Sequence, residues 1–191
     1  MLKNIFKFVI LVAFIYFLLM SLQPQRYNIW YPTIQSAYPN NGREIGIMVR
    51  DYFPKRTAEN IQFFKLTDPN PLEAFRGKIT EEQFQRLKKK VVRPEVVGKI
   101  KYYKQLYNRA RPMQVAPQIV NALESKTANN AAYPSGHAFQ AYYAAKILSK
   151  WEPERKKEWE DIAERVANIR IITGLHYPSD RDFARRLVEK L

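Results

Sequence analysis

The 191-residue sequence has no cysteine, two histidines and six glycines. Without cysteine, the chain has no disulfide bonds, thiol nucleophile or cysteine-ligated metal site. Two histidines without a cluster of further well-spaced ligands make a poor zinc site, so we predict no metal and no other cofactor. After Met20 no apolar run reaches the length of a membrane span, which excludes a multi-span membrane domain. With 46% hydrophobic residues and few glycines, most of the chain is expected to fold.

The length suits one folded domain, and the formal charge of +14 predicts attraction to anions. Charge alone does not distinguish phosphate esters, nucleic acid and anionic membranes. The densest basic run, residues 86–93, is interpreted as the solvated face of a helix, and contact with lipid headgroups or a polyanion is the alternative. We therefore regard nucleic acid as an unlikely partner and leave the oligomeric state open.

The N-terminal segment is typical of a protein that is exported. Residues 8–20 are uninterrupted apolar and aromatic, Lys3 and Lys7 precede them, and no acidic residue occurs before Glu44. The run is short for a membrane span, yet no small-x-small cleavage site follows it, which favours an uncleaved anchor over a cleaved signal. We predict a signal anchor or signal peptide over 1–22, a linker over 23–42 and a domain over 43–191. The domain would be periplasmic or otherwise extracytoplasmic, with the N-terminal helix in the membrane; a buried core helix is the alternative for this segment.

The domain itself is predicted to be all-α. Residues 40–42 suggest a turn, residues 44–50 a short strand or an irregular segment, and the prolines at 69 and 71 a break. Thr80 and Gln83 form a capping box that starts a helix over 81–92. Further helices are expected with apolar stripes over 96–107, from Ser135 through Leu148, from Pro153 toward a stop at Gly174, and over 180–191.

Two cations fall on or beside these apolar stripes. Lys104 lies in the middle of the stripe over 96–107, and helical rotation brings Arg170 to the edge of the stripe that holds Ile169. A buried cation costs free energy unless an anion meets it, so we expect something negative between these helices. Snorkelling, or pairing with a carboxylate of the domain, is the alternative for each. Arg111, beside the helix-ending Pro112, is a third candidate.

A helix N-terminus offers the next group of candidates. Ser135 is a natural N-cap after Pro134, and Gly136 lets a ligand approach the backbone closely. The first amides of that helix are therefore able to hold an oxyanion, and His137 points near the same end. A plain turn followed by a capped helix produces the same string of residues.

The second histidine has a carboxylate at a useful spacing. His176 and Asp180 are four residues apart, so the carboxylate can accept a proton from one ring nitrogen and leave the other as a nucleophile. The pair by itself also fits a structural hydrogen bond.

Taken in order, these blocks resemble the signature of the type 2 phosphatidic acid phosphatase superfamily, which also holds vanadium haloperoxidases. The blocks are Lys104-x6-Arg111-Pro112, Pro134-Ser135-Gly136-His137 and Arg170-x5-His176-x3-Asp180. Within the superfamily the likeness is to bacterial class A non-specific acid phosphatases, and the strings that carry it are KQLYNRARP, YPSGHAFQAYYAAKIL, EPERKKEW and ITGLHYPSD. The resemblance covers residues 96–191.

The resemblance implies a compact helical bundle of the phosphatase and haloperoxidase kind, and a metal-independent acid phosphatase acting on phosphomonoesters. It implies that His176 is the nucleophile, that Asp180 orients it, and that His137 is the general acid and base. The remaining matched residues would bind phosphate: Lys104, Arg111, Ser135, Gly136 and Arg170. Since His137 must start protonated among cations, we expect an acidic rate optimum.

Two positions depart from the family pattern. Ile169 stands where the family usually has serine, and Phe183 and Ala184 stand where it often has glycine. The alternatives to a soluble phosphatase are a lipid phosphate phosphatase at the membrane surface, a vanadate-dependent haloperoxidase and a non-enzymatic, membrane-tethered anion-binding protein.

Overall fold

The computed structural model describes residues 6–12, 14–15, 26–28, 30–32, 34 and 37–191. Within these residues every regular element is a helix, and the only β-type pairings are isolated bridges between Arg26 and Arg109 and between Arg76 and Ile79. The prediction of an all-α domain is therefore confirmed at the level of fold class.

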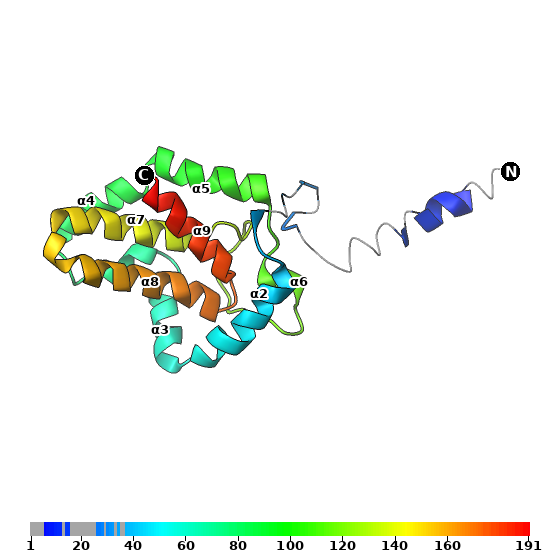
Figure 1. Ribbon diagram of the computed structural model, residues 1–191, viewed down its shortest axis with the longest axis horizontal. Coiled ribbons are helices and arrows are strands. Elements are labelled where there is room, and N and C mark those ends of the chain that lie inside the picture. Colours follow the sequence, from blue (N-terminus) through cyan, green and yellow to red (C-terminus); the bar gives the residue numbers. More distant parts are fainter. Residues whose placement is uncertain (1–5, 13, 16–25, 29, 33, 35–36) are drawn as a thin grey trace.

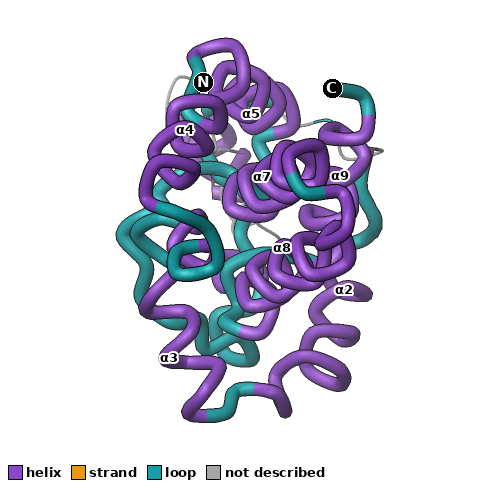
Figure 2. Tube along the Cα trace, turned by 90° about the vertical axis from the view of Figure 1, so that its left-hand side faces the viewer, coloured by secondary structure: helices purple, strands orange, loops and turns teal. Residues whose placement is uncertain are grey.

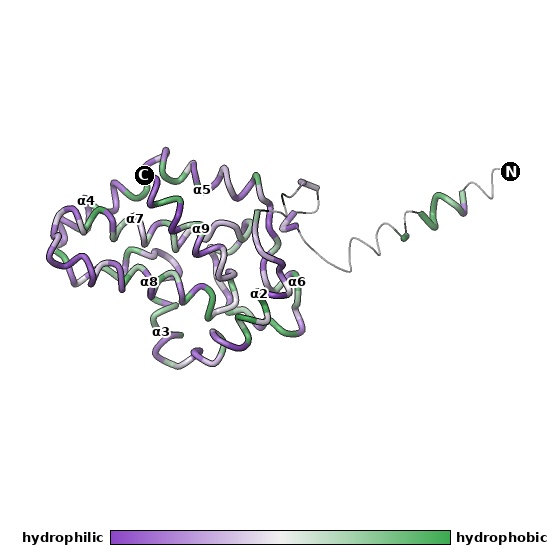
Figure 3. The backbone as a smooth tube through the Cα atoms, in the orientation of Figure 1, coloured by the Kyte–Doolittle hydropathy of each residue, from purple (hydrophilic) through white to green (hydrophobic). Residues whose placement is uncertain are grey.

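The predicted N-terminal anchor lies largely outside the described residues. Residues 6–12 and 14–15 are helical and solvent-exposed, and Figure 3 shows them as an apolar stretch. Among the described helices, none is long and apolar enough to cross a bilayer. The membrane anchor stays a prediction from the sequence.

The core is built around two long antiparallel neighbours, α7 (Gly136–Trp151) and α8 (Lys156–Ile172), which make the most extensive helix contact in the described chain. Alanines at 138, 141, 144 and 145 of α7 are buried, and their small side chains let α8 pack closely. Trp159, which is fully buried, fills the interface from α8. The α9 helix (Pro178–Glu189) packs on α7 and α8, and Figure 1 shows it crossing between them and α5.

Two helices cover one side of this core. The α4 helix (Glu81–Val91) begins with the predicted capping box, in which Gln83 N donates to Thr80 Oγ1 at 3.2 Å and Thr80 N donates to Gln83 Oε1 at 2.9 Å. The α5 helix (Pro94–Tyr107) ends at Asn108, which adopts the left-handed conformation at φ 43°. Both helices were predicted within a few residues of these bounds.

The prediction of a turn at 40–42 followed by a strand or irregular segment over 44–50 is wrong. The structure places α2 (Asn41–Ile47) there, followed by a π-helical turn, η2 (Met48–Tyr52). The side chain of Asn40 accepts a hydrogen bond from Arg43 N at 3.1 Å and caps α2. The asparagines that suggested a turn thus begin a helix.

Short elements complete the described fold. They are η3 (Phe53–Lys55), α3 (Ala58–Thr67), η4 (Pro71–Phe75), α6 (Pro112–Val115) and η5 (Pro153–Arg155). Pro153 begins a 3-10 turn rather than the long helix itself, which starts at Lys156. Gly174, at φ 80°, stops α8 as predicted, and a Cβ there would lie 3.1 Å from Ala122 Cα.

The chain brings the N-termini of α7 and α9, the C-terminus of α8 and the α5–α6 loop into one region. Ser135 N donates to Asp180 O at 3.1 Å, and both His176 N and Leu175 N donate to the Arg170 carbonyl. Figure 2 shows α7, α8 and α9 nearly end-on, with α3 and α2 below them. All the residues selected from the sequence as site candidates lie in this region.

Candidate functional site

His176 is fixed in one tautomer by the two groups that face its ring. Its Nδ1 donates to Asp180 Oδ2 at 3.0 Å, because a carboxylate only accepts. Its Nε2 lies 3.0 Å from Arg111 Nη1, and because a guanidinium only donates, Nε2 must carry the lone pair. Burial, followed by Arg111 and Lys104, holds the pKa of His176 well below its usual range. The imidazole is therefore a neutral base with its lone pair directed at Arg111.

Asp180 is held in turn by a buried ion pair that the sequence did not predict. Arg109 Nη1 donates to Asp180 Oδ1 at 2.6 Å, and Nη2 of the same guanidinium donates to Glu44 Oε2. Arg109 and Asp180 are fully buried, and Glu44 is 3% exposed. Burial raises the pKa of the Asp180 carboxyl, and the charge of Arg109 opposes that rise. Arg109 therefore helps to keep the partner of His176 ionised and in place.

Two features of the sequence could have pointed to Arg109 and Glu44. Arg109 stands two residues before Arg111 in the same conspicuous string, and Glu44 is the first acidic residue of the chain. Glu44 also accepts from Ser179 N at 2.8 Å and from Ser179 Oγ at 2.6 Å, at the start of α9. The wrong expectation for residues 44–50 concealed this contact.

The N-terminus of α7 carries Ser135 and Gly136 as predicted. Ser135 is buried, and its Oγ accepts from Ala138 N at 3.3 Å, so it acts as the N-cap. A Cβ on Gly136 would lie 3.9 Å from Lys104 Cε, so this glycine sits against the lysine side chain. Lys104 is 9% exposed, and its Nζ donates to the Ala131 carbonyl. The predicted burial of Lys104 is confirmed.

Arg170 forms an ion pair with Asp68, a carboxylate of the same domain. Its Nη1 donates to Asp68 Oδ1 at 2.7 Å, and its Nη2 lies 3.3 Å from both Ser125 Oγ and Thr127 Oγ1. The buried Nε has no hydrogen-bond partner in the described part of the chain. Arg170 is 1% exposed and therefore confirms the predicted burial, while Asp68 is a site neighbour that the sequence did not reveal.

His137 binds the backbone of Asp68, the residue whose side chain pairs with Arg170. Its Nε2 donates to the Asp68 carbonyl oxygen at 2.8 Å, so this nitrogen carries the hydrogen. Burial, followed by the charge of Arg170, lowers the pKa of His137 to about 3. The ring is thus neutral in the ligand-free protein at physiological pH.

Three buried cations surround these rings, and each has a lowered pKa. Burial lowers the pKa of Arg111 to about 10, aided by Arg170 and opposed by Asp180. Burial also lowers the pKa of Lys104, with Arg111 as the next cause, and that of Arg170, against the opposing charge of Asp68. An anion placed among them would offset both the desolvation and the mutual repulsion. The region is therefore electrostatically suited to an anionic ligand.

The residues that depart from the family pattern are accounted for by apolar packing. Ile169 is 1% exposed and packs in a cluster with Phe64, Ile172 and Leu175. Phe183 stacks on Tyr133 with the ring centroids 4.5 Å apart, and Ala184 is fully buried. Neither departure displaces a site residue.

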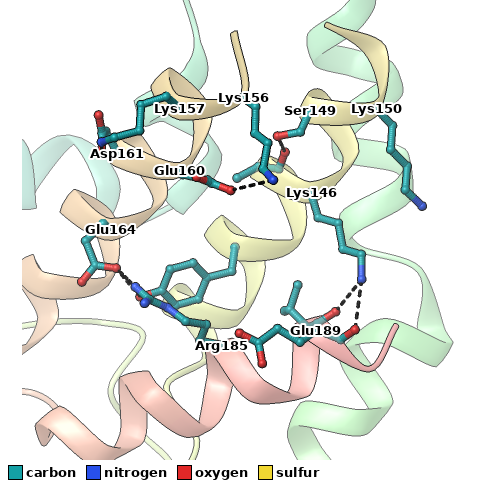
Figure 4. Close-up of a pocket in the computed structure, with 13 residues that line it drawn as sticks. Lys146, Ser149, Lys150, Lys156, Lys157, Glu160, Asp161, Glu164, Arg185 and Glu189 are labelled. Carbon is teal, nitrogen blue, oxygen red and sulfur yellow. Dashed lines mark hydrogen bonds and ion pairs between the residues drawn. The ribbon is translucent and has the colours of Figure 1, made fainter. Parts of the chain in front are cut away.

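A separate groove of about 950 Å³ lies between α7, α8 and α9, and no predicted site residue lines it (Figure 4). Its charges are largely paired with one another: Lys157 contacts Asp161, and Arg185 contacts Glu164. Lys146 Nζ donates to the Val188 carbonyl at 3.0 Å at the end of α9. We assign no chemistry to this groove.

The described residues contain no group of three histidine, aspartate or glutamate side chains arranged as metal ligands would be.

We expect the ligand-free protein to lose stability as the pH falls from 6.5 toward 3. His137 titrates near pH 6.5 when unfolded and near 3 when folded, so between these values only the unfolded chain binds this proton. The free energy of unfolding should then fall by about 1.4 kcal/mol for each pH unit of acidification from this group. Urea unfolding between about pH 4 and pH 7 measures the slope, and His137→Gln should reduce it by that amount. An unchanged slope in the variant would contradict the neutral, buried state of His137.

Comparison with known proteins gives partial similarities. No family model matches the chain. The chain is 34% identical over 62 residues to a non-specific acid phosphatase of Providencia stuartii, covering 32% of this chain and 25% of that protein. It is 33% identical over 88 residues to a non-specific acid phosphatase of Salmonella typhimurium, covering 43% of this chain and 34% of that protein. The chain thus spans a quarter to a third of the length of these curated relatives.

Proposed function

We propose that this protein is a metal-independent phosphatase that hydrolyses phosphomonoesters through a phosphohistidine intermediate. The observation that carries the proposal is His176, whose Nδ1–H is held by Asp180 and whose Nε2 lone pair faces a group of buried cations. A neutral imidazole is nucleophilic only through its unprotonated nitrogen. In this site that nitrogen points to where an anion would be stabilised. The partial similarity to two acid phosphatases supports the same chemistry.

In the first step Nε2 of His176 attacks phosphorus, and the bond from phosphorus to the ester oxygen breaks. The departing oxygen takes a proton from His137, so the alcohol leaves neutral. His176 now carries the phosphoryl group and a positive charge, which Asp180 stabilises through Nδ1–H. In the second step neutral His137 takes a proton from water, the water oxygen bonds to phosphorus, and the bond to Nε2 breaks. Inorganic phosphate is released and both histidines return to their initial states.

The phosphoryl oxygens would be held by Lys104, Arg111 and Arg170, with the Ser135 hydroxyl and the Gly136 amide at the positive end of α7. Arg111 and His137 must change hydrogen-bond partners when substrate binds. Arg111 Nη1, now 3.0 Å from Nε2, has to turn toward a phosphoryl oxygen and so exposes the lone pair. His137 has to exchange the Asp68 carbonyl for the ester oxygen. Substrate thus replaces hydrogen bonds that Arg111 and His137 otherwise make to His176 and Asp68.

The pKa of His137 determines the pH at which this residue is protonated and able to act as the general acid. At a pKa of about 3 it is neutral when the site is empty, and a bound phosphate dianion would raise that value because an adjacent negative charge favours the imidazolium. Protonation therefore accompanies substrate binding, and turnover should be fastest at acidic pH.

The proposal is tested with the full chain and a panel of aryl phosphates, sugar phosphates, nucleotides and phosphatidic acid. We expect hydrolysis of phosphomonoesters that survives a chelator and is inhibited by vanadate, which mimics phosphate at phosphorus-transfer sites. Hydrolysis confined to phosphatidic acid would favour a lipid phosphate phosphatase, and halide oxidation with vanadate and peroxide a haloperoxidase. Absence of turnover on the whole panel would overturn the proposal.

A further inference from the structure

We propose that residues 26–28 and 30–31, which follow the N-terminal segment, form a strap that holds the catalytic arginine loop in place, and that Asn108 and Gln114 are the positioning residues through which it acts. The arginine loop is defined as residues 108–114, which run from the end of α5 into α6. The inference rests on the proposed function, in which Arg111 binds a phosphoryl oxygen of the substrate.

The strap is fastened to the arginine loop by backbone and side-chain hydrogen bonds. Tyr27 N donates to the Asn108 carbonyl at 2.9 Å, and Arg26 forms an isolated antiparallel bridge with Arg109. The Asn108 amide accepts from Asn28 N at 3.0 Å and donates to the carbonyls of Asn28 at 2.7 Å and Tyr31 at 2.9 Å. One side chain thus satisfies three backbone groups of the strap. Asn108 is 4% exposed.

A second amide connects the strap to Arg111 directly. Gln114 Oε1 accepts from Arg111 N at 2.8 Å, while Gln114 Nε2 donates to the Tyr27 carbonyl at 3.2 Å. The backbone of Arg111 is therefore tied to the strap through one side chain.

The arginine loop needs such support because few local contacts define it. Asn108 has a left-handed backbone, and α6 is only four residues long. Arg111 points inward, where its Nη1 donates to the Leu175 carbonyl at 2.7 Å and contacts His176. A shift of about 1 Å at such a group can reduce turnover by about 100-fold. A strap that limits this motion would be part of the catalytic apparatus.

Two explanations of Asn108 predict opposite results for one substitution. If Asn108 serves only the left-handed backbone, Asn108→Gly should be at least as stable as the wild type, because glycine adopts that conformation without strain. If Asn108 fastens the strap, glycine removes three hydrogen bonds and releases it. Asn108→Asp should be worse still, because a carboxylate cannot donate to the carbonyls of Asn28 and Tyr31 and would repel them.

The experiment uses the wild-type chain, Asn108→Gly, Asn108→Asp and Gln114→Met, with folding of each variant checked by its thermal unfolding; Gln114 is only partly buried. Asn60→Ala is the control, since it removes the 2.9 Å hydrogen bond of Asn60 to the Lys55 carbonyl, far from the loop in sequence. Chymotrypsin cleavage after Tyr27 or Trp30, neither of which precedes a proline, reports release of the strap, and it does not depend on phosphatase activity. The inhibition constant of vanadate and the kcat/KM for an aryl phosphate report the position of Arg111.

We expect Asn108→Gly to be cleaved about 10-fold faster in the strap and to bind vanadate about 10-fold more weakly, equivalent to about 1.4 kcal/mol. Asn108→Asp should exceed both effects, Gln114→Met should weaken vanadate binding about 5-fold, and Asn60→Ala should match the wild type. Unchanged protection from chymotrypsin in both Asn108 variants overturns the strap. Faster cleavage with unchanged vanadate inhibition overturns the positioning role. If wild type neither binds vanadate nor hydrolyses any ester, the proposed function and the positioning role fall together, while the strap is still judged by cleavage.

Discussion

His176→Ala should reduce the hydrolysis of every phosphomonoester by at least about 1,000-fold, since the variant has no group to form the covalent intermediate. The side chain is 2% exposed and lies between Asp180 and Arg111, so its replacement leaves a small buried cavity between two charges and supplies no other nucleophile. Steady-state kinetics measure the loss. Quenching during turnover with alkaline denaturant should trap on the wild type a phosphoryl group that is stable in base and lost in acid, and none on the variant.

His137→Ala is the matched comparison, because it changes the other histidine of the chain. Its loss of rate should depend on the leaving group and be smallest for activated aryl phosphates, which need little protonation to depart. His176→Ala should show no such dependence. Near-native turnover by His176→Ala, in protein whose thermal unfolding shows it to be folded, would disprove the assignment of the nucleophile.

Arg109→Met should lower the free energy of unfolding by about 3–5 kcal/mol, because it leaves two carboxylates buried without their cation. Asp180 is fully buried and Glu44 is 3% exposed, and both bind the same guanidinium. The planar face of Arg109 also lies 3.8 Å from the Tyr177 ring centroid and 4.2 Å from that of Tyr38. Urea unfolding at neutral pH measures the change.

Arg50→Met provides the control, because Arg50 and Asp51 form an ion pair whose side chains are 73% and 42% exposed. Pairs of this kind contribute about 0–1 kcal/mol. Arg109→Lys should lie between the two, since lysine keeps the charge but lacks the fork that reaches both carboxylates. Equal destabilisation by Arg109→Met and Arg50→Met would show that the buried pair contributes no more than an exposed one.

Helical periodicity and capping residues predicted the elements that frame the site. The stripe over 96–107 placed Lys104 inward, and the Ser135 N-cap and the Thr80 capping box are present as predicted. These predictions succeed because neighbours three and four residues apart decide them. The prediction of a turn and a strand over residues 40–50 failed because an asparagine favours a turn and a helix cap equally in the sequence. The capping hydrogen bond to Arg43 N is visible only in the structure.

The pairing of the candidate residues depends on longer distances along the chain. His176 and Asp180 were joined correctly from a spacing of four, whereas the partner of Arg170 is Asp68, 102 residues away. Asp68 follows a helix and precedes two prolines, so in the sequence it resembles a solvated turn. Arg109 lies beyond the end of the α5 stripe, where periodicity gives no direction for a side chain.

The sequence by itself determined that this protein is helical, that Lys104 lies on the apolar face of its helix and Arg170 at the edge of another, and that His176 has a carboxylate within reach. Those features follow from local geometry, because the turn of a helix fixes which residues share a face. Only the tertiary structure decided which atom of His176 keeps its lone pair, that Arg109 and Glu44 support Asp180, and that the Asn108 side chain binds backbone groups of Asn28 and Tyr31. These contacts join segments 65 to 80 residues apart, and their positions are set by how the helices pack rather than by any pattern along the chain.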